Sequence, residues 1–158
     1  MNAEYSTSVD QTIQPGGAAF FDLAPVPCRA GLVYHRQGGT QFRLASPALM
    51  NVRRRCCCRM PNADYDVSFH GNVAVPEGGA VTAGISLQLA LDGAADPGSL
   101  MLATPVAVGD FANVGADIVV EVPWICRCSS VALVNTGTEP VTLRAGATIK
   151  FGFSGVTN

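Results

Sequence analysis

The chain has 158 residues, of which 48% are hydrophobic and only 14% are charged, and its formal net charge at pH 7 is −2. This length suits one domain with its own core, and no run approaches the roughly 20 apolar residues of a membrane helix. Because a lone monomer normally carries more surface charge, the composition indicates an oligomer, and the slight acidic excess gives no support to nucleic-acid binding.

The predicted elements are strands almost throughout. The polar start lacks a signal-peptide pattern, and we expect residues 1–15 to form an N-terminal arm, flexible or docking, ahead of one domain over 16–158. Turns rich in glycine and proline separate the apolar runs that follow, and no window shows capped helical periodicity. The predicted strands cover 18–22, 31–36, 41–45, 64–75, 84–91, 100–108, 117–123, 129–135 and 141–153.

Alternation with a period of two is clearest in 64–75, where Tyr65, Val67 and Phe69 share one face and Asp66 and Ser68 lie on the other. About nine or ten strands at this spacing predict an all-β protein. We expect a two-sheet antiparallel sandwich, with a jelly roll favoured over an immunoglobulin-like arrangement.

The stretch NVRRRCCCRMP, residues 51–61, combines four arginines with three consecutive cysteines. Cys56, Cys58, Cys126 and Cys128 could supply a four-thiolate zinc site or disulfides. Alternate thiols on a regular strand stand about 6.5–7 Å apart, however, whereas ligands of one zinc ion lie near ~3.8 Å from each other. We therefore expect reduced cysteines that act as small buried side chains, and no cofactor, with metal binding and disulfides kept as alternatives.

The arginines of this stretch have no aromatic residues among them, which disfavours nucleic-acid contact. Arginine is suited to bidentate pairing with carboxylates at interfaces. We therefore expect Arg55 and Arg59, which share a strand face, to lie at a subunit boundary. The candidate carboxylate partners are Asp64, Asp66, Asp117 and Glu121.

The segment GATIKFGFSG, residues 146–155, resembles the last strand of tumour-necrosis-factor (TNF) and C1q-like jelly rolls, with its aromatic-Gly-aromatic pattern at Phe151, Gly152 and Phe153. The segments DVSFHGNVAVPEGGAVTAGISLQLALDG, VEVP and VALVNTGTEPVTL resemble compact forms of that fold in phage structural proteins and at the tips of collagen-like spore-surface proteins. The resemblance implies a homotrimer of ten-stranded jelly rolls, packed through aromatic residues around a threefold axis. The interface candidates are Tyr65, Phe69, Phe151 and Phe153, together with Arg55 and Arg59.

With no collagen stalk and no export signal, the resemblance implies a bacteriophage virion protein. We expect a trimeric capsid decoration (head auxiliary) or short head-fibre protein, assembled in the host cytoplasm and exposed on the virion surface, with the major capsid protein as partner. The alternative is a receptor- or glycan-binding tip of a tail fibre or spore-surface protein, with Asp110, Phe111 and Asn113 as the ligand loop. No catalytic motif is present, so we expect no enzyme and neither nucleic acid nor membrane as partner.

Overall fold

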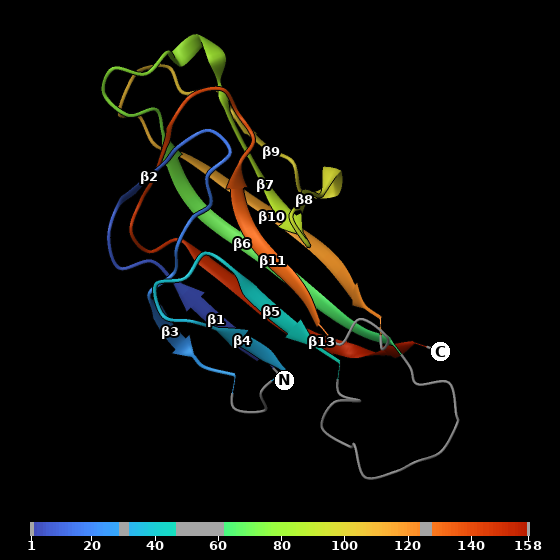
Figure 1. Ribbon diagram of the computed structural model, residues 1–158. Coiled ribbons are helices and arrows are strands. Elements are labelled where there is room, and N and C mark those ends of the chain that lie inside the picture. Colours follow the sequence, from blue (N-terminus) through green and yellow to red (C-terminus); the bar gives the residue numbers. More distant parts are fainter. Residues whose placement is uncertain (1, 29–31, 47–61, 124–127, 158) are drawn as a thin grey trace, which may run out of the picture.

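The computed structural model describes residues 2–28, 32–46, 62–123 and 128–157, and these ranges fold into two antiparallel sheets (Figure 1). Sheet A has seven strands, in the order β2-β12-β6-β13-β1-β3, and β10 pairs with the remaining side of β6. Sheet B has six strands, in the order β4-β5-β11-β7-β8, and β9 also pairs with β7. The predicted all-β, two-sheet sandwich is confirmed, and the described residues form thirteen strands in place of nine or ten.

The strands of each sheet are short except along the centre of sheet A. Sheet A contains β1 (Asn2–Ser6), β2 (Gln11–Ile13), β3 (Leu23–Val26), β6 (Asn62–Ala74), β10 (Ala112–Val122), β12 (Val141–Leu143) and β13 (Thr148–Thr157). Sheet B contains β4 (Val33–His35), β5 (Phe42–Ala45), β7 (Ile85–Leu91), β8 (Ala94–Ala95), β9 (Met101–Ala103) and β11 (Cys128–Asn135). Two single 3₁₀ turns, η2 (Val81–Ala83) and η3 (Pro97–Ser99), lie in the connections that flank β7 and β8.

The core fills the space between the sheets, because every second residue of a strand points to the same side. From β6, the residues Tyr65, Val67 and Phe69 point inward and are buried. Leu87 and Leu89 of β7 enter the same cluster from sheet B. The alternation seen in the sequence at 64–75 and 84–91 therefore marks the two inner faces of the sandwich.

The N-terminal residues are part of the sandwich, which corrects the expectation of an arm over 1–15. β1 lies inside sheet A, paired with β13 on one side and with β3 on the other (Figure 1). Its Ala3 and Tyr5 are buried, whereas Asn2 is exposed and Glu4 is half-buried. The polar residues Asn2 and Glu4 led to the prediction of an arm, although Ala3 and Tyr5 between and after them belong to the core.

Two predicted strands differ in detail from those observed. The strand expected over 141–153 is divided into β12 and β13 by a turn in which Gly146 has φ +86°, a conformation that favours glycine. Residues 18–22 make only single bridges, from Ala18 to Val134 and from Phe21 to Gly39.

The arginine- and cysteine-rich stretch 51–61, with Arg55 and Arg59, lies outside the described residues, as does Cys126. The described ranges contain no helix with the length and apolar character needed to cross a membrane.

Candidate functional site

The aromatic residues expected at a trimer interface lie inside the subunit. Tyr65 and Phe69 are 0% exposed and Phe151 is 1% exposed, so these side chains have no surface to offer to a neighbouring copy. The ring of Phe151 packs 4.9 Å from that of Phe42 across the core. Phe153 is partly buried against the core, with its ring 5.6 Å from that of Tyr65. The core role of the three buried rings replaces the expected interface role, because their strand face is the inner one.

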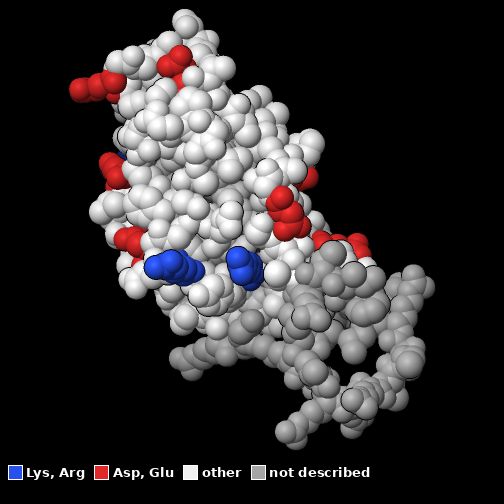
Figure 2. All heavy atoms as spheres, viewed as in Figure 1, with Lys and Arg blue, Asp and Glu red and all other residues white. Residues whose placement is uncertain are grey.

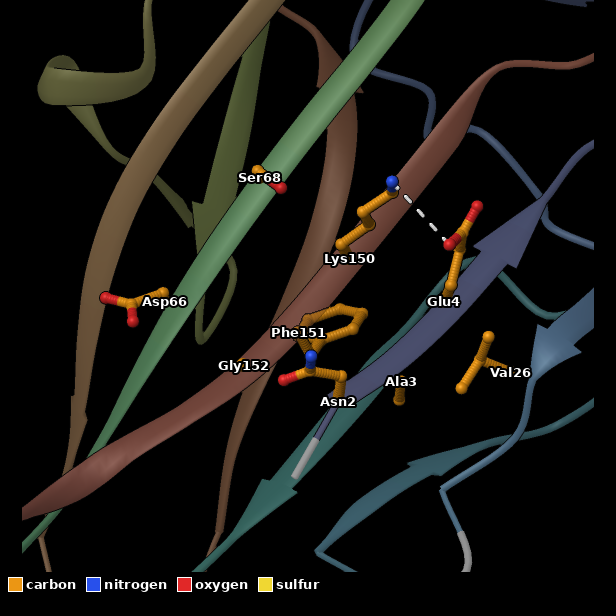
Figure 3. Close-up of a pocket in the computed structure, with 9 residues that line it drawn as sticks. All are labelled: Asn2, Ala3, Glu4, Val26, Asp66, Ser68, Lys150, Phe151 and Gly152. Atoms are coloured by element: carbon orange, nitrogen blue, oxygen red, sulfur yellow. Dashed lines mark ion pairs between the residues drawn. The ribbon is translucent and has the colours of Figure 1, made fainter.

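The outer face of sheet A carries a shallow depression of about 420 Å³ over β1, β6 and β13 (Figure 3). Its rim holds an ion pair between Lys150 Nζ and Glu4 Oε2 at 3.6 Å. Asp66 lies on the opposite side and accepts a hydrogen bond from the Ser154 hydroxyl at 2.6 Å. The full lining is Asn2, Ala3, Glu4, Val26, Asp66, Ser68, Lys150, Phe151 and Gly152.

Gly152 lies in the lining of this depression, in the middle of β13, paired with Asn2 of β1 and Asp66 of β6. A Cβ atom added here would meet its nearest neighbours at 3.7 and 3.8 Å, which is ordinary van der Waals contact, and the backbone has no positive φ. The fold of the subunit therefore does not require glycine at this position. Glycine inside a strand often marks a site where another backbone or a ligand approaches closely.

A second surface is the apolar edge, formed by Leu100, Leu102, Val106 and Val108 on β9 and the segments that flank it. All four side chains are exposed, and Val106 reaches 94% and Leu102 69%. The sequence carries no charged residue between Asp96 and Asp110. β9 runs beside β10 at this side of the sandwich (Figure 1). Several exposed aliphatic side chains in one uncharged segment are typical of a protein–protein contact.

The described surface is acidic. It includes all twelve Asp and Glu of the chain but only four of its ten Lys and Arg, which are Arg36, Arg43, Arg144 and Lys150. Figure 2 shows acidic groups spread over one face, with two basic groups close together. The carboxylates proposed as arginine partners do gather, because β6 and β10 pair Asp64 with Glu121 and Ser68 with Asp117. Their expected partners Arg55 and Arg59 lie outside the described ranges.

The structure brings the expected ligand-loop residues together with one that the sequence did not indicate. Phe111 is 42% exposed, and the guanidinium carbon of Arg144 lies 5.1 Å from the centre of its ring. Asn113, two residues along β10, is exposed and donates from its side-chain amide to Asn72 Oδ1 at 3.3 Å. Asp110 is exposed and precedes Phe111 directly. The proximity of Arg144 follows from pairing across β6 and has no local sequence signal.

The thiols of the described residues are not gathered into a metal site. The Cys28 sulfur accepts a hydrogen bond from the Val33 amide at 3.3 Å, and Cys128 is exposed at the start of β11. Among the described residues, no three His, Cys, Asp or Glu side chains are arranged to hold a metal ion. The other cysteines of the predicted zinc or disulfide set, Cys56, Cys58 and Cys126, lie outside the described residues.

Comparison with known proteins identifies the fold. The chain is similar to the globular domain of zebrafish complement C1qA, with a TM-score of 0.60, 9% identity and coverage of 99% of this chain and 98% of that one. It is similar to the TNF protein Eiger of S. frugiperda, with a TM-score of 0.60, 10% identity and coverage of 100% and 92%. It is also similar to murine APRIL, with a TM-score of 0.55, 8% identity and full coverage of both chains. No protein-family model and no curated protein matches the sequence. At these identities the likeness shows the fold, which is the TNF/C1q-like jelly roll.

Proposed function

We propose that this jelly roll is the subunit of a homotrimer that acts by assembly and surface attachment, without catalysis. The observation that carries the proposal is the apolar edge at Leu100–Val108. Burying such side chains stabilises an interface by roughly 25 cal/mol for each Å² of apolar surface removed from water. Only 14% of the residues are charged, so few surface charges oppose association of this apolar edge with another copy of the chain.

The proposed contact joins the two surfaces described above. In our proposal the apolar edge of one subunit packs on the outer face of sheet A of the next, at the depression beside Gly152. The contact is heterologous, because the two sides differ, and a rotation of one third of a turn closes it into a ring of three. The absence of a side chain at Gly152 lets the neighbour approach the backbone of β13 closely. The sequence resemblance to trimeric jelly rolls supports the same number of subunits.

Light scattering during size-exclusion chromatography tests the assembly. We expect a mass near three times the 16.4 kDa of the chain. Gly152→Val should lower the mass toward that of a monomer, because the added side chain protrudes into the contact, while its Cβ atom makes only ordinary van der Waals contacts within the subunit. The control is Arg43→Val on β5, exposed on sheet B, which should leave the trimer intact. A wild-type monomer, or a Gly152→Val protein that stays trimeric, would contradict the proposed interface.

We further propose that the trimer is a structural component of a bacteriophage particle, either a capsid decoration or a short head fibre on the virion surface. Its support is the resemblance of residues 66–93, 120–123 and 131–143 to phage structural proteins. Its partner would be the major capsid protein. Cryo-electron microscopy of particles made with and without this chain should show threefold density that is lost in its absence, and particles that contain no copy of the chain would refute the assignment.

A second candidate function is a receptor- or glycan-binding tip of a tail fibre or a spore-surface protein. The observation that favours it is the exposed Phe111 beside Arg144. A trimer would present three copies of this surface, which raises the strength of weak binding without any new contact. Both candidate functions require a trimer. They differ in the partner of its exposed surfaces, which is the capsid in the first and a receptor or glycan in the second.

A further inference from the structure

We propose that the end of the outer face of sheet A binds a neutral pyranose sugar through Phe111, Arg144, Asn72 and Asn113, which we call the platform. This deepens the second candidate function and rests on it, because it names the ligand class and the residues that would hold it. Among the described residues the platform is open to solvent: Phe111 is 42% exposed, and Asn72, Asn113 and Arg144 are exposed too.

The backbone holds Phe111 in a fixed position. β10 pairs with β6 from Ala112 onward, opposite Val73, so Phe111 directly precedes the first paired residue of a regular ladder. The loop before it is tied back by the hydrogen bond from the Gly109 amide to the Val75 carbonyl at 3.0 Å. An exposed aromatic ring on such an anchored backbone loses little conformational entropy when a ligand stacks on it.

Arg144 is fixed from the other side of β6. Its amide donates to the Asn72 carbonyl at 2.9 Å, which places the residue beside the end of β6. The Ala145 amide donates to Asp10 Oδ1 at 2.7 Å, and the Gly146 amide donates to the Thr7 carbonyl at 2.8 Å. The turn is thus held by three hydrogen bonds. The guanidinium lies over one face of the Phe111 ring, so the proposed sugar would stack on the other face, with the guanidinium N–H groups at the rim of the ring as donors to its hydroxyls.

Asn72 and Asn113 provide the complementary polar groups. They face each other across β6 and β10 and share one hydrogen bond of 3.3 Å between their side chains. Each amide carries two N–H donors and one acceptor oxygen, so most of this capacity stays open to a ligand. Amide and guanidinium groups set around one aromatic ring match a pyranose, which has hydroxyls around its rim and C–H bonds on its faces.

Other ligand classes fit the platform less well. It has a single apolar ring, whereas a protein partner would be anchored by a cluster of apolar side chains. Its one arginine, in a described part of the chain with twelve acidic residues, gives little attraction for a nucleic acid. Asp110 directly precedes Phe111 and adds a carboxylate to this loop, which disfavours an acidic sugar relative to a neutral one.

The platform is separate from the depression of the proposed trimer contact. Five residues of β6 lie between Asp66 at the depression and Asn72 at the platform, which is about 20 Å along the strand. The apolar edge ends at Val108, three residues before Phe111, so we place the platform beside the edge of the contact and outside the depression. Three platforms at one end of the trimer would bind a branched or repetitive glycan with avidity.

A printed array of neutral and acidic oligosaccharides tests the proposal with the labelled full chain as the probe. We expect the wild type to bind neutral pyranosides and Phe111→Ala to lose that signal by about tenfold or more, since loss of one stacked contact is worth roughly 1.4 kcal/mol. Asn113→Ala should weaken the same spots. The matched control is Tyr34→Ala, an aromatic residue on β4 that is 64% exposed, which should bind as the wild type does.

The mass of each variant is measured alongside, so a lost trimer is distinguished from a lost binding site. A trimeric wild type that binds no neutral glycan overturns the sugar proposal and leaves the trimer standing. Binding that survives Phe111→Ala, or that is restricted to acidic glycans, overturns it as well. Loss of binding in a Phe111→Ala protein that remains trimeric supports it.

Discussion

Tyr65 links the two sheets through a single hydroxyl group. Its ring belongs to β6 of sheet A, while its hydroxyl donates to the carbonyl of Ala45 in β5 of sheet B at 2.5 Å. Burial, with a smaller contribution from the nearby Cys28 thiol, raises the pKa of Tyr65 to about 12 from the ordinary 10.0. The folded protein therefore favours the neutral phenol.

This shift predicts how stability depends on pH in the alkaline range. Between pH 10 and about 12 the folded state keeps the Tyr65 proton that the unfolded chain loses, so the free energy of unfolding falls as pH rises through this window. Below pH 10 the contribution is fully present. Urea unfolding at several pH values should show the slope, and Tyr65→Phe should reduce it. Burial also raises the pKa of Tyr5, whose contribution is common to both proteins and cancels. An unchanged slope in Tyr65→Phe would contradict the assignment.

At the scale of elements, the alternation in β6 and β7 could be predicted from the sequence, because it depends only on the two-residue repeat of a strand. Whether the apolar face of β6 packs on the second sheet or on a second subunit could not be predicted. Tyr65 and Phe69 would alternate with polar residues in the same way whether they faced the second sheet or a second subunit. β1 was missed because Asn2, Glu4 and Ser6 interrupt a stretch with only two apolar inward positions. The contact between Arg144 and Phe111 depends on strand registers that join distant segments, so it could not be predicted from the sequence around either residue.

Gly71 in β6 tests how tightly the elements pack. A Cβ atom at this buried position would come within 2.9 Å of Phe69 Cζ and 3.1 Å of both Ala147 Cβ and Leu143 Cδ1. We expect Gly71→Ala to lower the free energy of unfolding by about 1–3 kcal/mol, because overpacking a filled core forces its neighbours to shift. The measurement is urea denaturation. Gly155→Ala in β13, with nothing within 4 Å of the added atom, is the control and should change little.

At the scale of the whole molecule, charge and apolar surface are unevenly distributed. The carboxylates are spread along the described surface, while the segment from Pro97 to Gly109 carries no charge. The jelly roll buries its core within one chain, so the exposed aliphatic side chains of this segment do not serve the fold of the subunit. They remain available for contact between copies.

Adding a charge to the apolar edge should separate the proposed trimer. Leu102→Glu would place a further carboxylate against a depression that already holds Glu4 and Asp66 beside its one lysine, while the isolated subunit keeps its exposed side chain in water. Analytical ultracentrifugation should show a shift to monomer. Val9→Glu, at a position that is 50% exposed between β1 and β2, should leave the mass unchanged. Equal behaviour of the two variants would count against an interface at the edge.

The position of β1 between β3 and β13 has a consequence for how the protein is made. Residues 2–6 pair with residues 148–152, so β1 can pair with the nearby β3 early but gains β13 only after all the residues between them have been synthesised. Until then, one side of β1 has unpaired backbone groups. Sandwiches dominated by such distant pairings fold slowly, in milliseconds to seconds. The pairing of β1 with β13 is therefore a late step of folding, and a nascent chain that has not yet reached β13 carries an open sheet edge.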